Sequence, residues 1–397
     1  MTSLPTLATI IGRELPSLVA LRHDLHAHPE IGLEEKRTAA RVSKELTDAG
    51  VEHLTGLAGG TGILAHIPGA SPRTMALRAD MDALPIAEET RLPYASTCPG
   101  VMHACGHDGH TTILVGAARI LASFARAKAL PRSVTLLFQP AEENLDGAPR
   151  MISDGALSGR LGGPVESIYA LHGWPWLEVG SIGVKDGPVM AAGDFFSITL
   201  AGRGSHAAWP HLAHDVVVAM AATVASLQTI VSRSTDPCTS AVVSVCRIRA
   251  GDALNVLPQQ LVFEGTIRTL GGDARARTLA RFDEIVTLTA RAHQCEATIR
   301  YTVGCPATIN DASATNAVRR AVACMAGAQV HEVTDPSMGG EDFAYYGEHA
   351  RASFYLLGLR PRGADSMPSL HHPLFDFNDD AIAAGVESMV RLAIAQD

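Results

Sequence analysis

The segment GHTTILVGAARILASFARA, residues 109–127, is followed by SVTLLFQPAEE, residues 133–143, and this succession decides the fold class. The first segment repeats apolar residues with the period of a helix, whereas the second is a short apolar and β-branched run that indicates a buried strand. Strands that alternate with helices predict an α/β sheet with helices on its faces. In such sheets ligands gather beyond the carboxyl ends of the strands, where this segment places two glutamates.

The alternation continues on both sides of this segment. Helical patterns occupy residues 15–30 and 34–50, and strand patterns occupy 62–69 and 74–84. Polar residues again follow apolar runs in LRADMD (77–82) and IYALHGWP (168–175). We therefore expect several chemically active side chains to meet at one edge of the sheet.

A second domain is predicted from about Asp194 onward. Strand and helix patterns there follow the order β-α-β-β-α-β of a ferredoxin-like domain, at residues 194–204, 214–233, 239–251, 259–270, 274–294 and 296–304. A chain of 397 residues also exceeds what one core usually supports. We expect a catalytic domain in two parts, residues 1–190 and 305–397, with the inserted domain at 191–304.

Composition excludes several classes of protein. The formal charge of −9 and the scattered Lys and Arg residues argue against a nucleic-acid partner. The N-terminus lacks a basic region before its apolar residues, so it predicts a helix rather than a signal peptide. The apolar run 216–231 is short and contains Thr, Ser and Gln, which favours a buried helix over a membrane span. Seven widely spread cysteines indicate a soluble protein of the reducing cytoplasm.

The stretch MHACGHDGHTT, residues 102–112, contains Cys105 and His107 separated by Gly106. Residues two apart diverge on a helix but converge in an extended or looped segment, so the pair can act together only off the helix. Thiolate and imidazole are ligands that zinc and related metals favour. A structural pair and a cysteine nucleophile with a histidine base remain alternatives.

Glu142 and Glu143 stand side by side where the strand before them ends. Adjacent residues on an extended chain face opposite ways, so one carboxylate could bind a metal while the other acts as general base toward water. A solvated Glu-Glu turn is the alternative. His172 follows an apolar run, and His371 and His372 precede Pro373. Five candidate ligands exceed what one tetrahedral ion needs, which favours two ions sharing a ligand: Cys105, His107, Glu143, His172 and His371.

Asp80 and Asp82 alternate at a strand end and are expected to share one face. One of them could orient a histidine ligand, and two turn aspartates are the alternative. Signatures of serine hydrolases, P-loop proteins and helical zinc proteases are missing from the sequence. A cysteine nucleophile would leave both glutamates and His371 unexplained.

Ten blocks of sequence resemble, in order, those of the dinuclear metallopeptidase family that contains aminoacylases and glutamate carboxypeptidases. The nearest branch is the amidohydrolases of the hippurate hydrolase, auxin-conjugate hydrolase and N-acetyldiaminopimelate deacetylase type. The resemblance runs from about residue 20 to about residue 380. The blocks are RHDLHAHPEIGLEE, LRADMDALPI, MHACGHDGHTT, FQPAEEN, LHGWP, GRGSHAAWPH, NVLP, GTIRT, GGEDFAYY and LHHPLFDFND.

This resemblance implies roles for individual residues. Cys105 stands where the carboxypeptidases have a metal-bridging aspartate, and it joins His107, Glu143, His172 and His371 as metal ligands. His371 is preferred to His372 because the family block reads Leu-His-x-Pro. Glu142 matches the general base, and Asp82 matches the catalytic aspartate behind the ligands.

The resemblance also implies that the insert is a lid and dimerisation domain. His206 falls at a histidine that stabilises the oxyanion, and Asn255 and Arg268 fall at positions that hold the substrate carboxylate. The implied activity is hydrolysis of N-acyl amino acids by a homodimer with two divalent ions per subunit, Zn, Mn, Co or Ni. A dipeptidase or carboxypeptidase on the same scaffold is the nearer alternative, and a non-catalytic metal-binding scaffold is the remote one. Trp174, Trp176 and Trp209 stand beside the blocks and could form a wall for the acyl chain.

Overall fold

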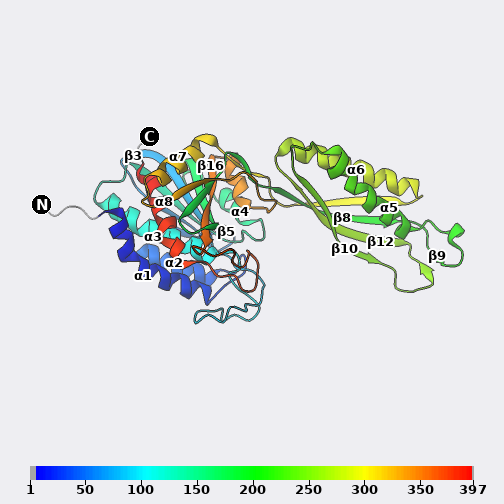
Figure 1. Ribbon diagram of the computed structural model, residues 1–397, viewed down its shortest axis with the longest axis horizontal. Helices are drawn as coiled ribbons and strands as arrows, with labels where there is room; N and C mark the ends of the chain where they lie inside the picture. Colours follow the sequence, from blue (N-terminus) through cyan, green and yellow to red (C-terminus); the bar gives the residue numbers. More distant parts are fainter. Residues whose placement is uncertain (1–5, 396–397) are drawn as a thin grey trace. The chain divides into compact units, whose positions relative to one another are not determined.

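The computed structural model describes residues 6–395 and divides the chain into two compact units, whose elements are labelled in Figure 1. Unit 1 comprises the chain up to Gly187, the segment Ile309–Asp335, and the chain from Asp342 onward. Unit 2 comprises Pro188–Thr308 and Pro336–Glu341. Compared with the expected insert, residues 191–304, unit 2 therefore also includes a short segment from the later part of the chain.

Unit 1 is built on a mixed sheet of eight strands in the order β1-β2-β4-β3-β5-β16-β6-β15. The four central strands β4, β3, β5 and β16 are parallel, whereas β1, β2 and β6 introduce antiparallel pairings. The carboxyl ends of the central strands therefore share one edge. The bounds are β1 (Glu52–Leu57), β2 (Gly62–Ile67), β3 (Ser71–Asp80), β4 (Arg132–Gln139), β5 (Val165–Glu178), β6 (Ser181–Val184), β15 (Gln329–Glu332) and β16 (Arg351–Arg360).

One face of this sheet packs against five helices in a single apolar core. Alternation along the strands turns Tyr169 and Leu171 of β5, with Tyr355 and Leu357 of β16, toward this core. The helix α3 is buried along most of its length, as the apolar residues of its sequence predict. The five helices are α1 (Leu7–His26), α2 (Lys36–Asp48), α3 (His107–Arg126), α7 (Ala312–Ala323) and α8 (Ile382–Ile394).

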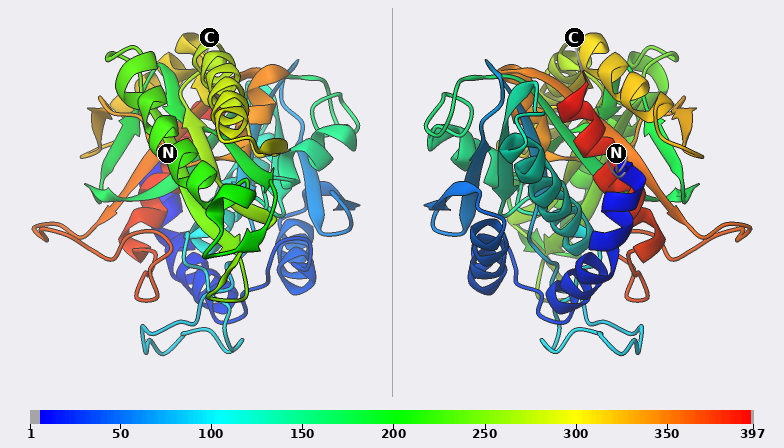
Figure 2. Two further views of the ribbon diagram at one scale, coloured as in Figure 1. Left: turned by 90° about the vertical axis from the view of Figure 1, so that its right-hand side faces the viewer. Right: turned by 90° about the vertical axis from the view of Figure 1, so that its left-hand side faces the viewer.

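The other face receives the alternate side chains of the same strands. There Phe354 of β16 lies with its ring centroid 5.5 Å from that of Phe343 in the 3-10 segment η3 (Asp342–Glu348). The short helix α4 (Gly147–Ser153) packs beside η3. Helical segments thus lie on both faces of a mixed sheet, with α1, α3 and α8 packed together on one of them (Figure 2, right), and the predicted fold class is confirmed.

Unit 2 contains a four-stranded antiparallel sheet in the order β10-β12-β8-β13. Its chain order is β-α-β-β-α-β, as the sequence predicts for a ferredoxin-like domain. The core contains the rings of Phe196, Phe263 and Phe282, and a ribbon of β9 (Ser205–His206) and β11 (Val256–Leu257) extends the unit. The main bounds are β8 (Ala192–Ala201), α5 (Val216–Thr229), β10 (Ala241–Ala250), β12 (Gln260–Thr269), α6 (Gly272–Ala292) and β13 (Glu296–Val303).

Two short strands carry the chain into and out of unit 2. They are β7 (Gly187–Met190) and β14 (Thr308–Asn310), and they pair with each other.

Helix α5 is less enclosed than its apolar sequence predicts. Val216 and Leu227 are buried against the sheet, but Val217 and Val218 on the other side are exposed. The expectation of a buried helix therefore holds for one face only. Within residues 6–395, Val216–Ser234 is the helical stretch that meets the length and composition of a membrane span, although the face containing Val216 packs in the core of unit 2.

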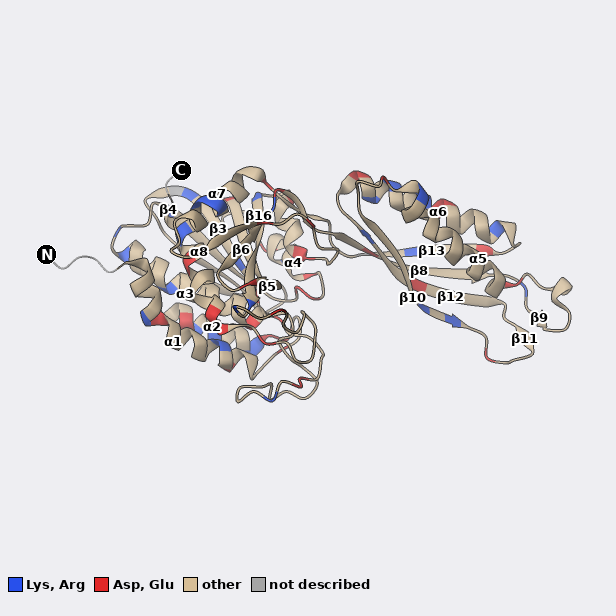
Figure 3. Ribbon diagram, in the orientation of Figure 1, with Lys and Arg blue, Asp and Glu red and all other residues tan. Residues whose placement is uncertain are grey.

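Acidic and basic residues are interspersed along both units (Figure 3). Helices α2 and α6 each carry residues of both signs.

Candidate active site and metal centre

The loop before α3 brings Cys105 and His107 together. Gly106 between them has a φ of 85°, which a glycine adopts without steric cost, and its carbonyl accepts hydrogen bonds from the Gly109 and His110 amides. Cys105 therefore lies off the helix, as expected, while α3 begins at His107 rather than near Gly109 to Thr111. Gly106 is the N-cap residue of α3, and its left-handed conformation is one that glycine adopts readily.

The five predicted ligands of unit 1 meet in overlapping groups. Potential donor atoms lie within 4.8 Å of one another in three sets: Cys105, His107 and His172; Cys105, Glu143 and His371; and His107, Glu142 and Glu143. The Cys105 Sγ lies 3.4 Å from the His172 Nε2. Because Cys105, His107 and Glu143 each belong to two sets, the donors form one continuous cluster.

His172 lies inside β5 and not at its end. The strand continues to Glu178, because β16 pairs with it in parallel beyond this point, from Ala352 opposite Ile168 to Gly358 opposite Trp174. Alternation turns His172 to the sheet face opposite the main core, where its ring lies 6.0 Å from that of Phe354.

His371, and not His372, faces the cluster. Its Nε2 lies 3.3 Å from the Glu143 Oε1, and its amide donates to the Ala104 carbonyl at 2.8 Å. The φ of His371 is 64°, an uncommon value for a residue with a side chain. The Nδ1 of His372 instead accepts a hydrogen bond from the Leu374 amide.

Glu142 and Glu143 point into the same site. Residues 142–145 form a turn, flanked by the positive φ of Ala141 and Leu145, so the expectation that an extended chain would send the two carboxylates opposite ways is not met. The His107 Nε2 lies 4.0 Å from Glu142 Oε2 and 4.0 Å from Glu143 Oε1. A turn replaces the strand here because Pro140 cannot donate to a ladder.

Asp82 and Asp80 both lie near His107, with the Asp80 Oδ2 3.8 Å from the His107 Nε2, but their hydrogen-bond partners differ. Asp82 accepts from the His107 Nδ1 at 3.2 Å and from the Glu143 amide at 2.9 Å, so it supports one histidine and the backbone beside one carboxylate. Asp80, the last residue of β3, accepts instead from His110 Nδ1 and Arg78 Nη1. The two aspartates are buried and hold different parts of the site.

The electrostatics of the cluster favour a cation. Burial, reinforced by Glu143 and Glu142, raises the pKa of the Cys105 thiol well above its usual range. Burial and the neighbouring His110 lower the pKa of His172, which keeps its imidazole neutral. The His107 Nε2 is buried and has no hydrogen-bond partner among the described residues. An orphaned nitrogen beside a thiol and two carboxylates fits the donor set of a divalent metal.

His206, Asn255 and Arg268 all belong to unit 2. His206 in β9 is joined to Asn255 through the ribbon, where the Ala207 amide donates to the Asn255 carbonyl at 3.0 Å. Arg268 lies at the far end of β12, with its guanidinium 5.7 Å from the centroid of the Phe195 ring. Within unit 2 the structure therefore brings His206 and Asn255 together, and Arg268 stands apart from them.

Sequence reasoning assigned no role to His103 and His110. His103 is buried with both ring nitrogens unpartnered among the described residues, and burial lowers its pKa to about 4. His110 has both nitrogens engaged, by Asp80 and by the Gly173 amide. The signal that could have identified His110 is its spacing: three residues after His107, it lies on the same face of α3.

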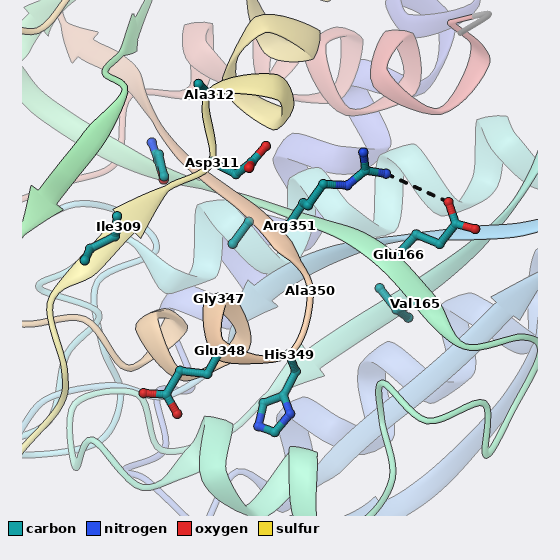
Figure 4. A pocket seen from close by; sticks show the side chains of 12 residues that line it. Val165, Glu166, Ile309, Asp311, Ala312, Gly347, Glu348, His349, Ala350 and Arg351 are labelled. Atoms are coloured by element: carbon teal, nitrogen blue, oxygen red, sulfur yellow. Dashed lines mark ion pairs between the residues drawn. The ribbon is translucent and has the colours of Figure 1, made fainter.

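A separate hollow of about 980 Å³ opens at the amino ends of β5 and β16. There Arg351 reaches toward Glu166, 3.9 Å away (Figure 4). Its lining includes Asp311 and His349 but none of the residues predicted to bind metal or substrate. The candidate site thus lies elsewhere on unit 1.

A family model described as peptidase family M20/M25/M40 matches residues 76–395. The chain belongs to this family. The predicted resemblance is confirmed, and the match includes the whole cluster around Cys105.

Named relatives of this M20-family protein include amide-cleaving enzymes. It is 41% identical over 366 residues to N-acetyl-L-cysteine deacetylase of Bacillus subtilis (strain 168), covering 92% of this chain and 84% of that protein. It is 36% identical over 381 residues to IAA-amino acid hydrolase ILR1-like 2 of Arabidopsis thaliana, covering 95% and 84%. A solved structure from Bacillus subtilis, a dinuclear metal-binding peptidase of the M20 family, matches with a TM-score of 0.84 at 34% identity, covering 96% and 98% of the two chains.

Proposed function

We propose that this M20-family protein hydrolyses the amide bond of N-acyl amino acids, releasing a carboxylic acid and a free amino acid. The observation that carries the proposal is the buried cluster in which Glu142 and the donor groups of Cys105, His107 and Glu143 converge. The two named relatives, a deacetylase and an amino-acid conjugate hydrolase, cleave acyl groups from amino acids by their names.

We propose Cys105, His107, Glu143, His172 and His371 as ligands of two divalent metal ions, of which zinc, manganese, cobalt and nickel suit these donors. The donor sets overlap, and Cys105, which belongs to two of them, would be the donor shared by the two ions. When bound, such ions polarise the amide carbonyl and lower the pKa of water. Asp82 fixes His107 by accepting from its Nδ1, which leaves Nε2 as the donor nitrogen.

Glu142 is the proposed general base. It is 5% exposed, its Oε1 is held by the Asp342 amide at 3.4 Å, and its Oε2 faces His107. In this position it takes a proton from the attacking water and returns that proton to the leaving nitrogen, so that the amine departs neutral. The carboxylate ends the cycle in its starting state.

For the oxyanion and the substrate carboxylate we propose the residues that the family resemblance implies, His206, Asn255 and Arg268. The His206 Nδ1 accepts a hydrogen bond from the Ala208 amide, so in the neutral ring Nε2 carries the proton and can donate to an oxyanion. Asn255 and Arg268 are proposed to bind the substrate carboxylate, for which a guanidinium is well suited.

An aromatic pair beside the site supports an acyl-group pocket. The ring centroid of Trp174 lies 6.2 Å from that of His172 and 4.8 Å from that of Trp176, which is 56% exposed. An exposed tryptophan next to a buried polar cluster offers apolar area to an acyl chain.

We also propose a homodimer in the cytoplasm. Unit 2 exposes Val217 and Val218 on α5 and Ile248 on the edge strand β10, and an apolar surface of this kind is typical of subunit contacts. No disulfide joins the cysteines of residues 6–395, and unpaired thiols of this kind are typical of proteins from a reducing compartment.

The test of the proposed reaction is Glu142→Gln. The variant is expected to bind the same number of metal ions as the wild type and to lose at least about 100-fold in kcat on acetyl- and benzoyl-amino acids, because the amide cannot accept the proton. Metal content is measured by mass spectrometry alongside the assay. Full turnover by the metal-loaded variant would contradict the mechanism, and cleavage of dipeptides but not acyl-amino acids by the wild type would replace the proposed substrate class.

A further inference from the structure

His110 is a fully buried histidine that the proposed mechanism does not use. It lies in the first turn of α3, and its ring centroid is 4.6 Å from that of His172. Both of its ring nitrogens have defined partners, in contrast to the unpartnered Nε2 of His107. The partners are groups whose donor or acceptor character is fixed, so they determine where the proton of His110 must be.

The Gly173 amide donates to the His110 Nε2 at 2.7 Å. A backbone N–H can only donate, so this nitrogen carries a lone pair and no proton. The proton of the neutral ring is therefore on Nδ1, which lies 2.7 Å from the Asp80 Oδ1 and donates to it. One tautomer of His110 satisfies both contacts.

The same residue, Gly173, fixes the tautomer of His172. The Gly173 carbonyl can only accept, and it lies 2.9 Å from the His172 Nδ1, which must be protonated to donate. The His172 Nε2 then presents its lone pair toward Cys105 Sγ, 3.4 Å away. The N–H and the C=O of one glycine thus join the two histidines.

Asp80 is itself held in place from behind. Arg78 Nη1 donates to Asp80 Oδ2 at 2.6 Å, and Arg78 also donates to Gln139 and to Asp342. Arg78 and Asp80 are fully buried, and a buried charge of either sign is costly without its partner. Both oxygens of Asp80 are engaged, so this carboxylate has a fixed orientation toward His110.

We propose that His110 is a positioning residue, which transmits the fixed orientation of Asp80 to Gly173 and so presents the Nε2 of His172 as a metal ligand. The inference rests on the proposed function in that His172 is taken to bind metal. Five residues are then linked by hydrogen bonds in which each donor and each acceptor is defined: Arg78, Asp80, His110, Gly173 and His172.

The alternative role for His110 is that of a metal ligand. Donor atoms of Asp80, His107 and His110 lie within 4.8 Å of one another, which is also the arrangement of a metal site. In the observed arrangement, however, His110 has no free lone pair, because Nε2 accepts from an amide and Nδ1 carries the proton. The positioning role uses both nitrogens, whereas a ligand role requires one of these bonds to break.

The experiment compares metal binding by His110→Phe, His110→Gln and a matched control, Thr112→Val. Phenylalanine keeps the ring volume but leaves the Gly173 amide and Asp80 unpaired, whereas glutamine retains one donor and one acceptor. Thr112 lies in the same helix, is equally buried, and its hydroxyl has no partner among the described residues, so valine removes nothing that the chain uses.

The readouts are the stoichiometry and affinity for Co²⁺ and Zn²⁺ in competition with a chelator, and the absorption spectrum of the Co²⁺ protein, which reports ligand geometry. We expect His110→Phe to weaken the binding of one of the two ions by roughly 10- to 100-fold and to change the absorption spectrum of the Co²⁺ protein. His110→Gln should recover part of that loss, and Thr112→Val should match the wild type. The inference would be overturned if folded His110→Phe kept the wild-type affinity and spectrum. It would also be overturned if the wild type bound a third ion and His110→Phe alone failed to bind it.

A measurement on the unmodified protein covers the case in which His110→Phe does not fold. With ¹⁵N-labelled histidine, the ring nitrogens of His110 and His172 are expected to show protons on Nδ1 in both residues. A proton on the Nε2 of His110 would overturn the inference. Failure of the proposed function would be seen separately. In that case the wild type itself would not bind two ions, or Glu142→Gln would keep its activity.

Discussion

The two units differ in how many charged groups they bury, since among the described residues unit 2 buries Asp194, which pairs with Arg275, and Glu341, whereas unit 1 buries many more. Unit 1 encloses charged side chains completely, including Arg22, Arg78, Asp80 and Asp108, each of which has a partner of opposite charge. The core of unit 2 is formed by apolar side chains such as Phe263 and Phe282, and this unit leaves large apolar residues exposed. A buried charge is stable only when its partners are in place. The residues around the buried charges of unit 1 must therefore keep a specific geometry. The exposed apolar residues of unit 2 are instead suited to contact with another surface.

The largest effect is expected from breaking the cluster of unit 1 at its shared donor. Cys105→Ala should lose bound metal and more than about 100-fold in activity, since even a supporting partner of a ligand is worth up to roughly that factor. The matched control is Cys246→Ala in unit 2, an exposed thiol whose removal should leave both quantities unchanged. Metal analysis and the acyl-amino acid assay measure the difference, and retention of both ions by Cys105→Ala would contradict the assignment.

Truncating one phenylalanine in each core tests how far the two units are independent. Phe282→Ala in unit 2 and Phe138→Ala in unit 1 each remove a fully buried ring and should cost about 3 to 5 kcal/mol of the free energy of unfolding. Hydrogen exchange is expected to rise within α6 and β8 in the first variant while α3 stays protected, and only the second should weaken metal binding. Equal loss of metal in both variants would contradict the comparison.

A pH dependence of stability is expected from unit 1. Burial lowers the pKa of His26, but the hydrogen bond to Asp108 at 2.8 Å outweighs it, and the pKa is raised to about 9. Because the folded pKa exceeds the unfolded value of about 6.5, the stabilisation is complete below pH 6.5 and is lost as pH rises to 9. The shift in pKa corresponds to at most about 3.4 kcal/mol of stabilisation. Urea unfolding of the wild type and His26→Gln across this range should converge toward pH 9, and a constant difference would contradict the linkage.

The smallest effect on stability is expected at the exposed apolar surface of unit 2. Val218→Asp and Ile248→Lys alter exposed side chains and should change the free energy of unfolding of a subunit by no more than about 0.5 kcal/mol. Sedimentation should nevertheless show monomers if the proposed homodimer uses this surface. Val262→Thr, on the half-buried side of β12, serves as the control. Unchanged dimers in both charged variants would place the subunit contact elsewhere.

Much of the candidate site could be predicted because most of its donors stand in short motifs or just after a strand, although His172 lies inside β5. Cys105 and His107 were expected to converge off the helix, and the positive φ of Gly106 provides that geometry. The turn at residues 142–145 was not expected, because two glutamates after an apolar run carry no local signal that distinguishes a strand end from a turn. The preference for His371 over His372 came from the family block, and the structure turns only His371 toward Glu143.

The supporting network could not be predicted, because its partners are far apart in the chain. Arg78 pairs with Asp342, and neither residue carries a local pattern that names the other. A buried arginine within an apolar strand is recognisable only after its carboxylates are placed around it. Arg268 is separated from the His206 ribbon by the length of β12. The carboxyl end of this strand was predicted correctly, but the sequence did not reveal which residues would lie near that end.

The hydrogen bond from the His371 amide to the Ala104 carbonyl has a consequence for the whole of unit 1. It joins two loops between which the entire sequence of unit 2 is inserted, so it closes a very long ring of chain. An ion held by Cys105 and His371 would close that ring a second time and act as a cross-link. Cross-links of long loops restrict the unfolded chain most, so chelation should lower the thermal midpoint of all of unit 1, including helices far from the ion.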